Sequence, residues 1–188
     1  MKLAVIFPGI GYHVDKPLLF YARKLAEECG YEIKDVPYGN FPSGVKGDAK
    51  KMEQAFYSAL MQAEELLKDV DFKAYATLLF ISKSIGTAVA AAYADKHDLH
   101  TYNLFYTPVE ATFPFIKQEG VVFHGTKDSW ARTETVEKEC RKKGLKLYLT
   151  ENANHSLETG DVIKDLEILK IIMEQSRAYM EELAWRSI

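Results

Sequence analysis

The sequence has few cysteines and no long apolar segment. Cys29 and Cys140 are the only cysteines among 188 residues and form no C-x-x-C pair, which favours a reducing compartment. The longest internal apolar run, around residues 88–93, is far shorter than the roughly 20 residues that cross a bilayer. The N-terminal run stops at Pro8-Gly9 without a small-residue cleavage site, so it reads as a strand rather than a signal peptide. We expect a cytoplasmic protein.

A large excess of charge of one sign is also missing. The formal net charge is -3 and the isoelectric point is near 6.0. Such a charge creates no field that would gather nucleic acid or anionic lipid, which argues against both as main partners. We therefore expect a small-molecule partner. The length fits a single domain over 1–188.

Apolar runs and periodic stripes alternate along the chain. Short apolar runs typical of buried strands alternate with segments whose apolar residues recur at three and four, as in helices. The expected strands are 3–7, 31–36, 75–81, 101–106, 121–123 and 145–150, and the expected helices are 16–29, 48–70, 85–95, 131–143 and 161–186. This alternation predicts a three-layer α/β sandwich with a mostly or wholly parallel six-stranded sheet. Ligands of such sheets bind beyond the carboxyl ends of the strands.

The third expected strand runs into Ser82-Lys83-Ser84-Ile85-Gly86 and then an alanine-rich helix. A nucleophile elbow needs small residues two before and two after the nucleophile, because the backbone folds sharply there. Ser82 and Gly86 meet that need around Ser84, whereas Phe80 would crowd an elbow centred on Ser82. An isolated serine at this place is more often a helix N-cap, so the assignment depends on the other loops.

Two further loops supply the other groups. Asp128 follows the fifth strand and His155 follows the sixth, on the sheet edge that carries Ser84. Either residue alone is more often a turn or solvated side chain. Three such groups in the order Ser, Asp, His are the arrangement expected of a serine hydrolase with an α/β sheet.

With these motifs the sequence resembles the α/β-hydrolase superfamily, particularly compact members similar to dienelactone hydrolases and carboxylesterases. The resemblance implies strand order 2-1-3-4-5-6 without a cap domain, with Ser84 as nucleophile, Asp128 as acid and His155 as base. It also implies an oxyanion hole from the backbone N–H groups of Ile10 and Ile85. Two positions depart from the usual pattern: Ser82 replaces glycine, and Pro8 replaces the histidine that commonly follows the first strand here.

These motifs predict hydrolysis of a small carboxylic ester, thioester or lactone through an acyl-enzyme, with no cofactor and no metal ion. The aromatic and histidine residues on strand-end loops are candidates for a substrate pocket: Tyr12, His13, Phe105, Tyr106, Phe113, Phe115 and Trp130.

Two alternatives remain open. Gly9-x-Gly11 after the first strand, with Asp35 after the second, is weakly typical of a nucleotide-binding module, although the third glycine is missing. A non-catalytic binding protein on the same fold is the other.

The last expected helix also predicts an assembly. Its apolar stripe for packing on the sheet is Val162, Leu166, Leu169, Met173, Ser176, Met180 and Leu183. Further apolar residues widen this surface: Ile168, Ile171, Ile172, Tyr179 and Trp185. We expect a homodimer that uses this helix.

Overall fold

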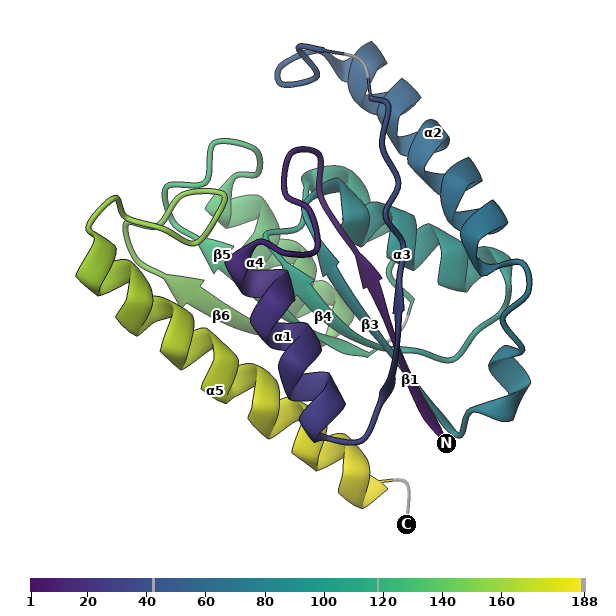
Figure 1. Ribbon diagram of the computed structural model, residues 1–188. Coiled ribbons are helices and arrows are strands. Elements are labelled where there is room, and N and C mark those ends of the chain that lie inside the picture. The colour runs from purple at the N-terminus through teal and green to yellow at the C-terminus, as the bar shows by residue number, and fades with distance from the viewer. Residues whose placement is uncertain (42, 118, 187–188) are drawn as a thin grey trace.

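The computed structural model describes residues 1–41, 43–117 and 119–186, with strands and helices alternating along the chain (Figure 1). The strands are β1 Lys2–Phe7, β2 Glu32–Asp35, β3 Thr77–Lys83, β4 Tyr102–Tyr106, β5 Gly120–Gly125 and β6 Lys146–Thr150. The α-helices are α1 Pro17–Glu28, α2 Ala49–Leu67, α3 Ile85–Lys96, α4 Thr133–Lys143 and α5 Val162–Arg186, and two 3-10 helices are η1 Phe72–Ala74 and η2 Glu110–Phe115.

The six strands form one parallel sheet in the order β2-β1-β3-β4-β5-β6. Helices α1 and α5 cover one face, α3 and α4 cover the other, and α2 packs against α3 (Figure 1). Within the described residues no domain is inserted as a cap over the sheet. The predicted three-layer architecture and strand order are confirmed.

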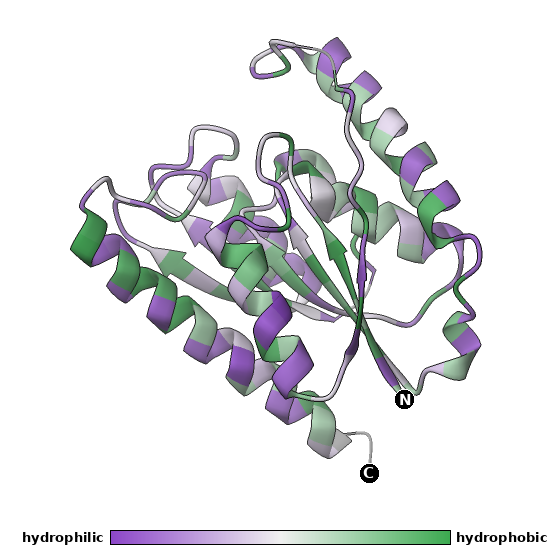
Figure 2. Ribbon diagram, viewed as in Figure 1, coloured by the Kyte–Doolittle hydropathy of each residue, from purple (hydrophilic) through white to green (hydrophobic). Residues whose placement is uncertain are grey.

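The pleat of the strands divides the apolar residues between two cores. In β1, Ala4 and Ile6 face the α1 and α5 layer, whereas Val5 and Phe7 face the layer of α2 and α3. Because both faces are covered, the central strands are predominantly apolar, and Figure 2 shows them as mainly hydrophobic between helices that carry both hydrophobic and hydrophilic residues. This burial fixes the positions at which the loops leave the strand ends.

Helix α5 packs along the expected stripe in its C-terminal half, at Ser176, Met180 and Leu183, but along a different one nearer its start. Its buried side chains are Ile168, Ile172, Ser176, Met180 and Leu183. Val162 and Leu166, which the expected stripe included, are 73% and 58% exposed. They line an open pocket of about 360 Å³ between α1, the loop after β6 and the start of α5. In the part of the chain that the structure describes, no helix combines the length and apolarity needed to span a membrane.

Candidate active site

Ser84 occupies the sharp turn between β3 and α3. Its backbone has φ 58° and ψ -127°, a strained conformation for a residue with a side chain. The turn is held because Ser84 N–H donates to the carbonyl of Tyr106 (3.0 Å) and its own carbonyl accepts from the hydroxyl of Thr87 (2.6 Å). Gly86 is required, since a Cβ there would lie 2.3 Å from the Pro8 carbonyl oxygen. Ser84 makes no side-chain cap to α3, so the N-cap interpretation does not describe it.

The loops after β5 and β6 are packed against each other. Gly125 ends β5, where a Cβ would lie 2.3 Å from the carbonyl oxygen of Ala153 in the neighbouring loop. The same carbonyl accepts a hydrogen bond from Lys127 N–H (2.9 Å). In the second loop, the Asn154 side-chain oxygen accepts from Ser156 N–H (2.7 Å), which shapes the turn around His155. Asp128 and His155 are thus brought together by backbone contacts.

The three side chains form a continuous hydrogen-bonded chain. His155 Nδ1 lies 2.7 Å from Asp128 Oδ2, and His155 Nε2 lies 2.7 Å from Ser84 Oγ. Trp130 N–H donates to the other carboxylate oxygen of Asp128 (2.8 Å), and the Trp130 ring stacks on the imidazole with centroids 5.2 Å apart. The Asp128 side chain is fully buried, whereas that of His155 is 16% exposed. This arrangement can pass a proton from the hydroxyl to the imidazole.

Burial and hydrogen bonding set the charges of this chain. Burial lowers the pKa of His155, the hydrogen bond to Asp128 opposes that effect without cancelling it, and the charge of Lys83 adds to the lowering. Burial alone would raise the pKa of Asp128, but the bonds from His155 and Trp130 outweigh it and hold that pKa below its ordinary value. At neutral pH, Asp128 is therefore a carboxylate and His155 a neutral base.

The loop that follows β1 also packs against the elbow. Gly9 and Tyr12 exchange two backbone hydrogen bonds (3.1 and 3.2 Å), with Gly11 between them at φ +69°. A Cβ on Gly9 would lie 3.0 Å from Ser84 Cβ, and Ile10 packs in one small cluster with Ile85. Within the described residues, the backbone N–H groups of Ile10 and Ile85 donate no hydrogen bond to a protein acceptor. Two free donors therefore sit on residues adjacent to Ser84.

The predicted pocket residues divide into those buried in the core and those near the surface. Phe105 and Phe113 are buried in the core between the sheet and the α3 and α4 layer, and the Tyr106 hydroxyl bonds Ser176 in α5 (2.7 Å). These three side chains therefore fill the core rather than a pocket beside Ser84. Phe105 and Tyr106 do so because both faces of β4 are covered, and Phe113 because η2 packs against α3 and α4. Tyr12 is buried and its hydroxyl accepts from Leu18 N–H.

The other three predicted pocket residues lie nearer the surface. His13 is exposed and pairs with Asp15 at 3.8 Å. Phe115 and Trp130 do line pockets beside the elbow.

Helix α2 and its leading loop form the walls of two pockets that sequence reasoning missed. The buried face of α2 consists of Ala55, Ala59, Ala63 and Leu67 rather than the bulkier residues one position away. Those bulkier residues instead line a largely apolar pocket of about 610 Å³, which reaches Ile85 next to Ser84. Its lining includes Met52, Phe56, Tyr57, Ile85, Ala88, Val109, Ala111 and Phe115.

The second pocket, of about 360 Å³, adjoins the imidazole through Trp130. It is lined by Val45, Lys46, Gly47, Asp48, Ala49, Met52, Ser129 and Trp130. Ala49 and Met52 line both pockets, so the two form one groove along the start of α2. The sequence feature that could have indicated these pockets is the row of bulky apolar residues on α2. Such a row is also typical of a helix face that packs on the core.

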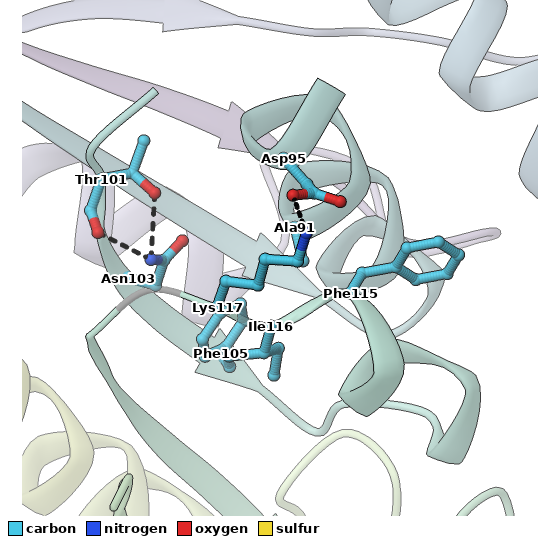
Figure 3. A pocket seen from close by; sticks show the side chains of 8 residues that line it. All are labelled: Ala91, Asp95, Thr101, Asn103, Phe105, Phe115, Ile116 and Lys117. Carbon is cyan, nitrogen blue, oxygen red and sulfur yellow. Dashed lines mark hydrogen bonds and ion pairs between the residues drawn. The ribbon is translucent and has the colours of Figure 1, made fainter. Parts of the chain in front are cut away.

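A narrow crevice lies at the opposite end of the sheet (Figure 3). Asn103 and Thr101 near the start of β4 hydrogen-bond each other there, and Asp95 pairs with Lys117. Because Ser84 follows the other end of the neighbouring strand, this crevice is remote from the hydrogen-bonded chain. Among the described residues no cluster of three or more histidine, cysteine or acidic side chains could hold a metal ion.

The elements expected of a nucleotide-binding module are arranged differently. Helix α1 begins at Pro17, five residues beyond the Gly9–Tyr12 turn, so Gly11 does not open a helix. Asp35 pairs with Arg23 at 3.0 Å. The geometry therefore offers no phosphate cradle at this loop.

Comparison with known proteins rests on three-dimensional structure. No family model and no curated protein matches the sequence. Est1E from Butyrivibrio proteoclasticus, in a structure with bound ferulic acid, is similar over 97% of this chain and 89% of its own, with TM-score 0.70 and 14% identity.

Two further structures are similar over most of the chain. Dienelactone hydrolase from Anabaena variabilis covers 97% of this chain and 86% of its own, with TM-score 0.67 and 12% identity. A serine hydrolase without lid from Xanthomonas campestris covers 95% and 82%, with TM-score 0.59 and 13% identity. With its sheet order and this likeness, the chain has the α/β-hydrolase fold, in a form without a cap domain.

Proposed function

We propose that this protein is a serine hydrolase that cleaves a carboxylic ester, thioester or lactone through an acyl-enzyme. The observation that carries the proposal is the chain from Asp128 through His155 to Ser84, with both bonds at 2.7 Å and Ser84 held in a strained turn. A serine hydroxyl is a poor nucleophile at neutral pH, and a neutral imidazole within hydrogen-bond reach activates it.

In the proposed reaction, Ser84 Oγ attacks the acyl carbonyl while its proton passes to His155 Nε2. The imidazolium then protonates the leaving alcohol or thiol, and the acyl group remains on Ser84. A water molecule repeats the cycle, losing a proton to His155 and releasing the carboxylic acid and free Ser84. Asp128 fixes the imidazole tautomer and stabilises its cation throughout.

The free N–H groups of Ile10 and Ile85 are the proposed donors to the developing oxyanion. Their location beside Ser84 supports this role, since the turn at Gly9 and the start of α3 both adjoin the nucleophile. Each well-aimed donor of this kind contributes about 3 kcal/mol to lowering the barrier.

The groove along α2 favours a substrate with an apolar group. The larger pocket offers mainly aliphatic and aromatic surface, while the smaller pocket carries Lys46, whose ammonium lies 5.6 Å from the Trp130 ring centroid. The Est1E structure binds ferulic acid, an aromatic carboxylic acid, so esters of aromatic carboxylic acids belong among the substrates to test.

A non-catalytic binding protein on the same fold is the alternative, and replacing each elbow serine separates the two. Ser84→Ala should reduce hydrolysis of p-nitrophenyl esters about 10⁴-fold or more, because it removes the nucleophile. Ser82→Ala should keep most of the activity, since the buried Ser82 hydroxyl only donates a 3.3 Å bond to the Leu104 carbonyl. Reversed behaviour would move the nucleophile to Ser82, and equal, unchanged rates would remove both.

A further inference from the structure

Lys83, the last residue of β3, is a lysine that is only 1% exposed. Among the described residues it forms no ion pair with a carboxylate. Its Nζ donates instead to the main-chain carbonyl of His155 at 2.7 Å, and it lies 4.9 Å from the centroid of the Tyr12 ring. A buried lysine costs free energy, so its retention beside the nucleophile calls for a role.

The carbonyl that Lys83 bonds has a second donor. Thr107, in the turn after β4, donates its hydroxyl to the same His155 oxygen at 3.0 Å. The His155 loop is thus tied to the ends of two central strands. Lys83 directly precedes Ser84, so its hydrogen bond connects the residue before the nucleophile to His155, which must accept the proton of Ser84.

The charges around this tie come from several elements. Asp128 in the β5 loop and Glu158 in the β6 loop attract the ammonium, whereas the imidazole of His155 competes with it for the same carboxylate. Burial lowers the pKa of Lys83 to about 7, against the attraction of these two acids. The buried His124, 3.8 Å from Asp128, adds a further group that disfavours a cation at His155.

We propose that Lys83 is a positioning residue, which holds the main chain of His155 so that the imidazole stays in line with Ser84 Oγ. The proposal rests on the proposed function for its kinetic consequence, but the geometry of the tie can be tested without it. A proton acceptor that shifts by about 1 Å loses on the order of 10²-fold in rate, so loss of the tie should act on kcat rather than on KM.

Lys83→Met keeps an unbranched side chain that is one atom shorter, and it removes both the donor and the charge. We expect kcat for a p-nitrophenyl ester to fall about 10- to 100-fold with KM within about twofold. The acid limb of the kcat/KM profile should move to higher pH, because the ammonium that disfavours the imidazolium is gone. The matched control is Lys143→Met, since Lys143 Nζ also donates to a main-chain carbonyl, that of Ile116 (2.8 Å), but far from the elbow. It should leave kcat and the pH limb unchanged.

A second pair of variants tests the same carbonyl without changing Lys83, in case Lys83→Met fails to fold. Thr107→Val removes the other donor and should lower kcat without moving the acid limb, because no charge is lost. Thr107→Ser retains the hydroxyl and should restore kcat. If Thr107→Val has full activity and Lys83→Met, when folded, does too, the tie has no positioning role.

Nuclear magnetic resonance titration of the His155 imidazole gives a readout that does not depend on turnover. The pKa of His155 should be higher in Lys83→Met than in the parent protein, and unchanged in Lys143→Met. An identical titration in Lys83→Met and the parent, together with an unchanged kcat in Lys83→Met, overturns the proposal. Absence of any ester turnover in the parent would instead count against the proposed function, while the titration still shows whether Lys83 acts on the His155 imidazole.

Discussion

The protonation of a single imidazole sets the pH range in which the proposed reaction runs. His155 must be neutral to accept the proton of Ser84, so activity rises with pH through its pKa. The Asp128 bond alone would raise that pKa above 6.5, but burial outweighs it and the pKa is lowered.

We therefore predict that kcat/KM reaches half its maximum on the acid side at a pH below 6.5. Steady-state rates from pH 4.5 to 8 in buffers of constant ionic strength provide the measurement. An acid limb centred clearly above 6.5 would mean that the Asp128 interaction, rather than burial, dominates at His155.

We predict that activity requires the charge of the Asp128 carboxylate, and not only the shape of its side chain. Asp128→Asn preserves volume but presents an amide N–H or a weaker oxygen acceptor to His155 Nδ1, which favours the wrong tautomer. We expect kcat to fall by about 10⁴-fold while the melting temperature changes little. Near-normal rates would transfer the role to another acid, such as Glu158 in the His155 loop.

At the scale of elements, we propose that helix α2 determines which substrates fit. Its alanine face lies against α3, and its bulkier residues are left to line the apolar pocket. Ala111, an exposed residue of η2 at the rim, can be enlarged without disturbing the core.

Ala111→Trp should narrow this pocket. We predict a loss of about 10- to 200-fold in kcat/KM for esters of long-chain or aromatic carboxylic acids, with acetate esters little affected. The control is Ala178→Trp, a similar change at an exposed position of α5 far from the pocket. Equal losses for short and long acyl groups would show that the pocket does not hold the acyl chain.

Elements and loop positions were predictable from the sequence because each depends on local pattern. Alternating runs and turn residues gave the six strands, and small residues around Ser84 indicated the elbow. Side-chain direction was less accessible: Phe105 and Tyr106 are neighbours that point to opposite faces of β4, and both faces are buried. The pocket under α2 depends on which stripe of that helix meets α3, and the sequence offered two adjacent stripes.

At the scale of the whole molecule, the start of α5 leaves an apolar surface uncovered. Val162, Ile163, Leu166 and Ile171 are each more than half exposed and lie within the first turns of the helix. The expected homodimer through α5 remains our proposal, now centred on these residues rather than on the buried Ile168 and Ile172.

One chain has a mass of 21.4 kDa, and light scattering at micromolar concentration should give twice that mass. Leu166→Glu should return the protein to a monomer without changing the circular dichroism spectrum, because Leu166 lies outside the buried stripe. A monomer in the unmodified protein would remove this proposal and leave the apolar surface as one wall of the pocket beside α1.

The most direct test of the central claim is covalent labelling with a fluorophosphonate, followed by intact-mass and peptide mass spectrometry. The probe's phosphorus is attacked by an activated serine oxygen, and the fluoride leaves. We predict one adduct per chain, located on Ser84, formed faster above the pKa of His155 and absent from Ser84→Ala. A protein that stays unlabelled at millimolar probe, or that carries its adduct on another residue, would contradict the assignment of Ser84 as nucleophile.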